Sequence, residues 1–232
     1  MLPLKDNVPT RRLPILTIAL IAANLAVWIL YENAGGRGFH ASVNELAYHP
    51  CEVDNTCRQI GEDWPVTIFT SMFMHGSWAH VLGNMLFLWI FGNNVEDTLG
   101  RLRFLLFYVL GGVAATALQT FVTLEYGSVR DAAVPNLGAS GAIAGVLGAY
   151  LVLHPGGMVL TWIAPIFFVP IPALVYLGLW FVFQLVEGGY SFTHPEQGGG
   201  VAYFAHVGGF LFGLVTVKLF QPEARRPLRP TY

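Results

Sequence analysis

The chain has 232 residues, of which 54% are hydrophobic and 11% are charged, whereas soluble domains carry about 25% charged residues. This composition excludes an ordinary soluble domain and a disordered chain. The net charge of −2 offers no basic surface for a nucleic acid, and two cysteines cannot build a disulfide-rich scaffold. The remaining class is a membrane protein with several spans.

A helix that crosses a bilayer needs about 20 predominantly apolar residues. The first candidate exceeds the 7–15 apolar residues of a signal peptide, so we interpret it as a true span. We expect the second to begin a few residues before Trp78, and we interpret the proline-containing stretch from Met158 as interfacial or irregular. The expected spans are Leu13–Tyr31, Trp78–Gly92, Phe104–Leu124, Ala139–Leu153, Ile171–Val186 and Val201–Phe220.

The predicted fold class is therefore all-α, a polytopic bundle of six transmembrane helices. Residues 1–12 form an N-terminal arm, residues 13–220 form the membrane domain, and residues 221–232 form a tail. Nine Lys and Arg residues fall on the side of the two termini and three on the other side. The positive-inside rule then places both termini in the cytoplasm, and we expect the cell membrane as the location.

Four polar residues inside the expected spans are candidates for a function, because polar groups are costly there and commonly functional. Taken singly, each has an ordinary alternative as a packing residue or an interhelical hydrogen bond. We expect two further amides, Gln119 and Gln184, to make packing hydrogen bonds only. The four candidates are His80 and Asn84 in the second span, Ser140 at the start of the fourth and His206 in the sixth.

These four side chains are expected to lie at a similar depth. The second, fourth and sixth spans all enter from the outer side, and a helix rises about 1.5 Å per residue. His206 then lies roughly 8 Å below the outer surface, as does Ser140, and His80 and Asn84 share one face of their helix. The sequence thus predicts a polar cluster near the outer side.

The cluster contains the groups that a serine hydrolase needs. A serine hydroxyl becomes a nucleophile when a base such as histidine takes its proton, which suits Ser140 and His206. The free N–H groups at a helix start, with His80 and Asn84, can stabilise the oxyanion. Gly138 and Gly141 flank the serine and allow a substrate backbone to approach. Spans four and six contain no Asp or Glu for a triad, so we predict a dyad.

Three motifs make the sequence resemble the rhomboid family of intramembrane serine proteases. They are His75-Gly76-Ser77-Trp78-Ala79-His80-Val81-Leu82-Gly83-Asn84, Gly138-Ala139-Ser140-Gly141 and Ala205-His206-Val207-Gly208-Gly209. The resemblance implies a six-helix rhomboid-like bundle, with Ser140 as nucleophile and His206 as base. It assigns the oxyanion hole to His80, Asn84 and the Ser140 amide.

The resemblance also implies supporting residues. His75 matches a structural histidine, and Glu96 matches an acid that braces the inner helix ends, with a solvated loop carboxylate as the equal alternative. Two departures from the family pattern are Pro65 after Trp64, where Arg is common, and Ala144, where some members stack a Tyr on the base. What orients His206 is therefore open.

Packing should bring the two helices together. Gly141 with Gly145, and Gly209 with Gly213, form small-residue faces that let helix backbones approach closely. We expect Gly209→Leu to abolish activity without preventing insertion. The glycine-rich loop 188–200 is expected to cap the site and move. Cys51 and Cys57 lie in an outer loop where a disulfide is permitted but not required.

The resemblance implies single-pass transmembrane proteins as substrates, cleaved in or near their spans. We expect the lipid bilayer as the environment and no cofactor, metal or nucleic acid. The absence of an H-E-x-x-H motif disfavours a metalloprotease. A proton-coupled transporter using His80 and His206 is an alternative, although no internal repeat supports it, and a catalytically inactive helix-binding relative is another.

Overall fold

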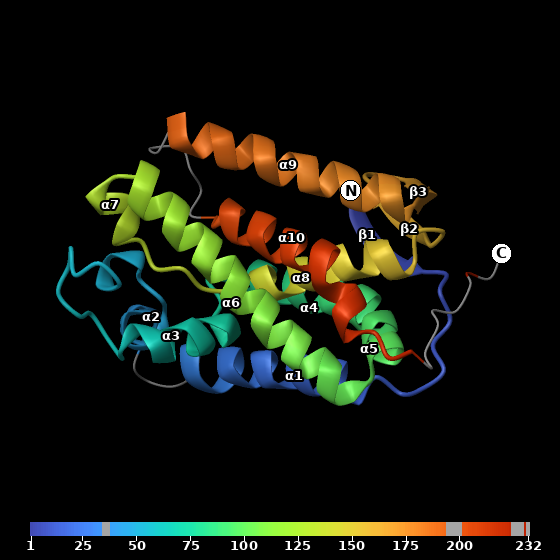
Figure 1. Ribbon diagram of the computed structural model, residues 1–232, viewed down its shortest axis with the longest axis horizontal. Coiled ribbons are helices and arrows are strands. Elements are labelled where there is room, and N and C mark those ends of the chain that lie inside the picture. Colours follow the sequence, from blue (N-terminus) through green and yellow to red (C-terminus); the bar gives the residue numbers. More distant parts are fainter. Residues whose placement is uncertain (34–37, 194–200, 224–229, 231–232) are drawn as a thin grey trace.

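The structure is a computed structural model, which describes residues 1–33, 38–193, 201–223 and 230. Most of these residues are helical, but residues near the N-terminus and between two long helices form a small antiparallel sheet. The mainly helical prediction is confirmed, and the prediction of an all-α fold is wrong in this detail. Figure 1 shows α1 and α9 at opposite edges of the bundle, with α8 and α10 between them.

The helices follow the apolar segments of the sequence in order. The helical elements are α1 (Ile15–Val27) with its continuation Trp28–Asn33, α2 (Phe39–Leu46), Pro50–Glu52, α3 (Trp64–Thr70), Ser71–Phe73, α4 (Trp78–Phe87) with its continuation Leu88–Gly92, α5 (Asn93–Leu99), α6 (Arg101–Tyr126), α7 (Val129–Ala132), α8 (Ser140–Leu153), α9 (Ala173–Thr193) and α10 (Tyr203–Phe220).

Among the described residues, four helices are long and apolar enough to cross a bilayer. They are Ile15–Glu32, Arg101–Tyr126, Ala173–Ser191 and Tyr203–Phe220, and Ser140–Leu153 is a shorter apolar helix. These segments match the first, third, fifth, sixth and fourth predicted spans to within a few residues, except that α9 extends beyond Val186. The chain is therefore a membrane protein with several spans.

The second predicted span begins later than we expected. Ser77 has an extended backbone, and its side-chain oxygen accepts a hydrogen bond from the His80 amide at 3.1 Å, as an N-cap does. This cap starts α4 at Trp78, so the prediction of an earlier start is wrong. The helix continues through residues 88–92 into α5, which ends at Leu99 before Gly100 at φ +82°.

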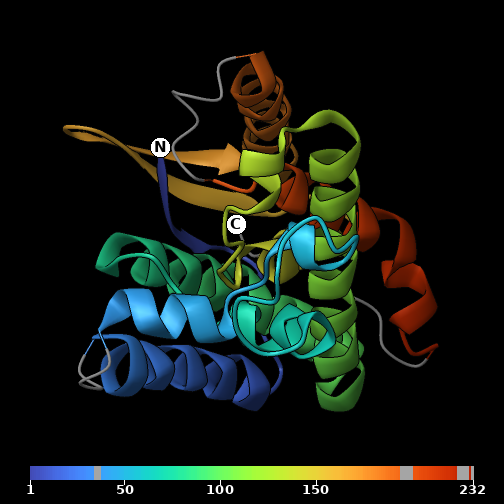
Figure 2. The ribbon, with the colours of Figure 1, turned by 90° about the vertical axis from the view of Figure 1, so that its left-hand side faces the viewer.

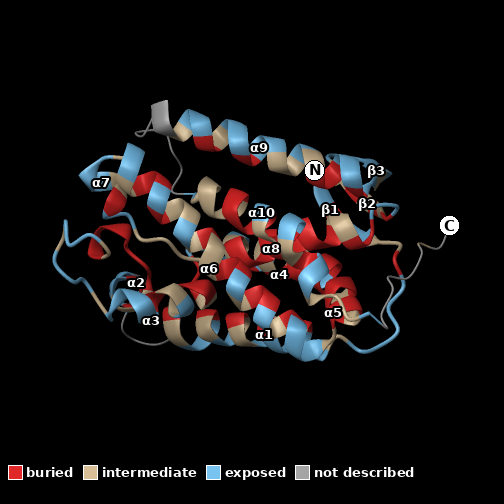
Figure 3. Cartoon of the chain, in the orientation of Figure 1, coloured by how far each residue is buried: buried red, intermediate tan, exposed pale blue. Residues whose placement is uncertain are grey.

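Helix α8 lies at the centre of the molecule. Residues Gly141–Tyr150 are all buried, and Figure 3 shows the buried residues concentrated in α8 and the helices around it. Glycines let α10 approach α8 closely. A Cβ at Gly209 of α10 would overlap the carbonyl oxygen of Gly141 in α8, and one at Gly213 would overlap that of Gly145. The two helix backbones are thus in direct contact.

The sheet replaces the irregular segment that we predicted. Strands β1 (Leu2–Asp6), β2 (Met158–Ile163) and β3 (Phe167–Pro172) are antiparallel in that order, with Met158 opposite Pro172 in the β2–β3 hairpin. The alternation of β-branched and aromatic residues favours strands here, and Pro170 and Pro172 lie on the edge strand, where they interrupt no central ladder. The expected N-terminal arm is thus partly a strand.

The β2–β3 hairpin projects away from the helices, as Figure 2 shows. Its apolar tip is exposed, with Ile166 at 70% and Phe168 at 60% of full exposure. Exposed aromatic residues between two apolar helices are typical of the membrane–water boundary. The interfacial location of this segment stays a prediction.

Asp6 connects the sheet to the helix bundle and gives a pH-dependent prediction. Its carboxylate accepts hydrogen bonds from the Tyr150 hydroxyl at 2.6 Å and from the Asn94 amide. Burial raises the pKa of Asp6 from 3.8 to about 6. Because the folded state binds this proton more tightly, the free energy of unfolding should rise as pH falls through about 6 and level off near 4.

This dependence can be isolated with Asp6→Asn, which retains an acceptor without the titration. Thermal unfolding in detergent micelles between about pH 7.5 and 5 should show a larger stabilisation on acidification for the wild type than for the variant. Parallel profiles for the two proteins would contradict the assignment.

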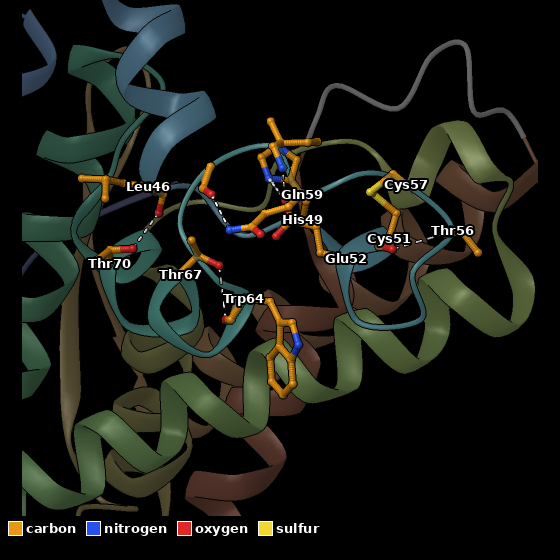
Figure 4. A network of polar contacts seen from close by, with 12 residues as sticks. Leu46, His49, Cys51, Glu52, Thr56, Cys57, Gln59, Trp64, Thr67 and Thr70 are labelled. Carbon is orange, nitrogen blue, oxygen red and sulfur yellow. Dashed lines mark hydrogen bonds and ion pairs between the residues drawn. A yellow bond between two sulfur atoms is a disulfide. The ribbon is translucent and has the colours of Figure 1, made fainter.

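The longest loop is ordered by its own contacts, which Figure 4 shows. Cys51 and Cys57 form a disulfide, with Cα atoms 5.4 Å apart. A Glu52 carboxylate oxygen accepts the Ile60 amide at 2.8 Å, and the Thr70 hydroxyl donates to the Leu46 carbonyl at 2.7 Å. The sequence permitted this disulfide without requiring it, and the structure shows that it forms.

Candidate functional site

Ser140 is positioned by the turn that precedes α8. The amide of Gly138 donates to the Ser71 carbonyl at 2.9 Å, and Gly138 has φ +121°, a conformation that L side chains rarely adopt. The chain turns here, so that Ser140 becomes the first residue of the helix. The positive φ of this turn therefore favours glycine at position 138. Ser140 itself lies half-buried at the start of the helix.

Ser140 and His206 are brought into direct contact. The Ser140 hydroxyl Oγ lies 2.8 Å from His206 Nε2, although the two residues are 66 positions apart in the chain. His206 lies in the first turn of α10, which packs along α8 through the glycine faces. The close approach of these two helices is what allows the short side chain of serine to reach the imidazole.

His80 is held beside the same turn. Its ring nitrogen Nδ1 accepts a hydrogen bond from the Gly76 amide at 3.3 Å, and its other ring nitrogen, Nε2, lies beside Gly138. A Cβ built on Gly138 would lie 2.8 Å from His80 Nε2 and 3.6 Å from Ser140 Oγ. Gly138 thus lies between the two side chains, and only the absence of its Cβ leaves room there.

Asn84 is held by His75. The side-chain nitrogen Nδ2 of Asn84 lies 3.0 Å from His75 Nε2, and the rings of His75 and His80 meet edge-on with centroids 5.1 Å apart. His75 is fully buried, whereas Asn84 and His80 are half-buried. Because an amide nitrogen carries two hydrogens, Asn84 keeps one N–H beyond this contact.

The start of α8 adds backbone donors. The first amides of a helix have no partner within it, and Ile143 is the residue whose amide first bonds back, to the Ala139 carbonyl at 3.0 Å. The amides of Ser140 and Gly141 precede it and lie at the positive end of the helix dipole. This end of α8 can therefore stabilise a negative charge next to Ser140.

Two contacts of His206 were missed by the sequence analysis. Its Nδ1 lies 2.7 Å from the side-chain oxygen of Gln184, and the ring of Trp180 lies beside the imidazole with centroids 5.8 Å apart. Gln184 is 4% exposed on α9. The sequence does show that Gln184 is a polar residue in an apolar span. It does not show which neighbouring helix the Gln184 side chain faces.

Glu96 binds the beginning of α1. Its two carboxylate oxygens accept the Leu16 and Thr17 amides at 3.0 and 2.8 Å, and the Thr17 hydroxyl at 2.8 Å. With 3% exposure, Glu96 is not a solvated loop carboxylate. A negative group at a helix N-terminus fills its free donors, so this contact joins α1 to α5.

Glu32 is a second buried acid that we did not single out. It is 3% exposed and accepts the His75 amide at 2.9 Å and 3.1 Å with its two carboxylate oxygens. It therefore holds the backbone of His75, the residue whose side chain contacts Asn84. No local pattern predicts this pairing, because the two partners are 43 positions apart in the chain.

Part of the expected capping loop is helical. Gly188 and Gly189 belong to α9, which runs to Thr193, so the prediction of a loop from position 188 is wrong there. Helix α9 continues through these two glycines because a membrane helix tolerates glycine when neighbouring residues pack against it, as Phe204 does at Gly188. Residues 194–200, which hold the remaining glycines, lie outside the described residues.

Across residues 1–33, 38–193 and 201–223, the structure shows no group of three His, Cys, Asp or Glu side chains that could hold a metal ion. The groups around Ser140 are its own hydroxyl, the His206 imidazole and several hydrogen-bond donors. This set suits acyl transfer by nucleophilic attack.

The chain is similar to known proteins over more than half of its length. The Rhomboid domain model matches residues 62–223. Rhomboid protein 1, mitochondrial, of Saccharomyces cerevisiae is 31% identical over 152 residues, 65% of this chain and 40% of that protein. Rhomboid protease GluP of Bacillus subtilis is 33% identical over 138 residues, 60% of this chain and 24% of that protein.

A third relative is presenilin-associated rhomboid-like protein A, mitochondrial, of Danio rerio, which is 34% identical over 145 residues, 62% of this chain and 34% of that protein. The matched stretch thus spans less than half the length of each of these relatives. The family model covers well over half of this chain and includes the segments that carry Asn84, Ser140 and His206. The chain belongs to the rhomboid family.

Proposed function

We propose that the protein is an intramembrane serine endopeptidase with a Ser140–His206 dyad. The observation that carries the proposal is the 2.8 Å contact between Ser140 Oγ and His206 Nε2, made between two membrane helices at a half-buried position. Membership of the rhomboid family and similarity to a relative named as a rhomboid protease support it. Neither a proton path nor mere helix binding needs this serine at a helix start.

The reaction follows ordinary acyl transfer. Ser140 Oγ attacks the scissile carbonyl carbon while His206 Nε2 takes the hydroxyl proton. When the tetrahedral intermediate collapses, the C–N bond breaks and the imidazolium returns the proton to the leaving amine. Water then attacks the acyl-enzyme with His206 again as base, which releases the carboxylate product and restores the serine hydroxyl.

The proposed oxyanion hole consists of the Ser140 amide, Asn84 and His80. Gly138 keeps the space between His80 and Ser140 open, since a Cβ there would contact both side chains. Donors that are fixed before the reaction stabilise the developing charge without reorganising. His75 and Glu32 support this group because His75 contacts Asn84 and Glu32 accepts the backbone amide of His75.

The proposed substrates are single-pass membrane proteins, cleaved in or near their spans. We place six spans in residues 13–220, with α4 and α8 as the two short ones, and both termini in the cytoplasm. The distribution of Lys and Arg supports this orientation. We also propose that the protein lies in the cell membrane with its site facing outward. The named relatives include both mitochondrial and bacterial proteins, so they do not by themselves select one membrane.

A cleavage panel tests the function. The wild type and Ser140→Ala are expressed with tagged single-pass proteins in the same membranes, and each is incubated with a fluorophosphonate probe. We expect cleavage and labelling at Ser140 in the wild type alone. A transporter or an inactive helix-binding relative would give neither, and cleavage that persists in Ser140→Ala would exclude Ser140 as the nucleophile.

Removing one oxyanion donor should have a smaller effect. Asn84→Ala should lower kcat on the order of 10²–10³-fold with little change in KM, because the hydrogen bond strengthens only as the oxyanion forms. Steady-state cleavage of one panel substrate measures both constants. A variant with full kcat would show that Asn84 is not an oxyanion donor.

A further inference from the structure

The far side of the His206 ring has a defined hydrogen-bond partner. His206 Nε2 faces Ser140 at 2.8 Å, and His206 Nδ1 faces the side-chain oxygen of Gln184 at 2.7 Å. The first contact comes from α8 and the second from α9. The imidazole is thus bound at both nitrogens, and each contact constrains the other.

The orientation of the Gln184 amide is itself determined. Its nitrogen Nε2 donates to the Trp180 carbonyl, one turn earlier on α9, at 3.3 Å. That carbonyl can only accept, so the amide nitrogen must face it and the amide oxygen must face His206. Gln184 is 4% exposed, so nearly all of the residue is shielded from solvent.

An amide oxygen accepts hydrogen bonds and cannot donate them. His206 Nδ1 must therefore carry the proton, and Nε2 of the neutral ring must carry the lone pair. This is the tautomer that can take a proton from Ser140. In the other tautomer, the lone pair of Nδ1 would face the Gln184 oxygen, so that two acceptors would repel each other. Its proton would lie on Nε2 and face Ser140, so that this nitrogen could not take the hydroxyl proton.

We propose that Gln184 is a positioning residue that selects the active tautomer and ring orientation of His206. It takes the place that an aspartate occupies in a Ser-His-Asp triad, but it is neutral, which avoids the cost of a buried charge in a span. Trp180 limits rotation of the ring from its face, at 5.8 Å between centroids. This inference rests on the proposed function.

The kinetic test compares three variants in the full-length protein. Gln184→Met keeps the length of the side chain but replaces the amide oxygen with a thioether sulfur, which is only a weak acceptor for the Nδ1 proton. We expect kcat to fall about 10²-fold with KM changed less than about twofold, as for a misoriented catalytic group. Gln184→Glu restores an acceptor and should recover kcat to within about fivefold, whereas Gln184→Asn, which is one methylene shorter, should not.

Gln119→Met provides the matched control. The Gln119 oxygen accepts the Ala205 amide at 3.1 Å, so this amide also contacts α10 next to His206, but it does not touch the imidazole. We expect its kcat to stay within about threefold of the wild type. Equal losses in both Met variants, or a Gln184→Met variant with unchanged kcat, would overturn the proposal.

A second readout does not depend on activity. In Ser140→Ala with ¹⁵N-labelled histidine in nanodiscs, NMR should show a protonated Nδ1 and an unprotonated Nε2 for His206. In Gln184→Met on the same background, we expect a mixture of tautomers. An unchanged tautomer would overturn the role of Gln184, whereas absence of Ser140 labelling in the wild-type protein would instead overturn the proposed function.

Discussion

Combining Ser140→Ala with His206→Ala is expected to reduce cleavage no further than Ser140→Ala alone. Each single change should lower kcat by a factor on the order of 10⁵–10⁶, because the serine and the base act as one unit. Once the nucleophile is absent, the imidazole has no proton to take. The expected coupling is therefore nearly as large as either single effect.

The measurement is the initial rate of cleavage of one reconstituted substrate by the wild type, both single variants and the double variant. Thr216→Ala is the matched control, since its hydroxyl lies on α10 and donates only to the Phe212 carbonyl at 2.7 Å. It should retain wild-type kcat within about threefold. Losses that multiply in the double variant would contradict a shared step.

Gly209→Leu is expected to abolish cleavage while leaving membrane insertion intact. A Cβ at this position would overlap the Gly141 carbonyl oxygen, which belongs to the helix backbone and cannot move aside alone. The two helices must separate, at a cost of about 1–3 kcal/mol or more. Since a displacement of 1 Å in a catalytic group costs about 10²-fold, we expect at least that loss in kcat.

Leucine is favourable in a membrane helix, so the variant should still insert. Alkaline extraction of membranes measures insertion, and cleavage of the panel substrate measures activity. Gly178→Leu is the matched control, because nothing lies within 4 Å of a Cβ at that position of α9. Normal cleavage by a well-inserted Gly209→Leu protein would show that close approach of α8 and α10 is not required.

Both predictions depend on the same structural feature, the direct contact of α8 and α10. The glycine faces set the distance between the helices, and the distance decides whether a short serine side chain reaches the histidine. The Gln184 contact from α9 adds orientation on the other side of the ring. Packing and chemistry are therefore coupled at His206.

Much of this could be predicted from composition and spacing. Apolar length located the long helices, because the bilayer thickness imposes a minimum number of residues. The rarity of polar groups in spans singled out Ser140 and His206, and helix rise placed them at a similar depth. Helix starts were less predictable: the Ser77 N-cap begins α4 at Trp78, whereas we expected the second span to begin a few residues earlier.

Other features were decided by the tertiary structure alone. The β1–β2 pairing joins residues about 155 positions apart, which no local pattern specifies. The carboxylates of Glu32 and Glu96 are buried against amides that are 43 and 79 or 80 positions away in the chain. The sequence shows that Gln184 is polar and in a span, but the rotation of α9 against α10 decides that it meets His206.

The physical reason for this division is the range of the forces involved. Hydrophobic length and helix periodicity act within one segment and can be read from consecutive residues. Hydrogen bonds need partners within about 3 Å and a suitable direction, and only the packing of several helices brings such atoms together. The amino-acid order by itself determined which residues could form the site, and the packed fold decided which of them touch.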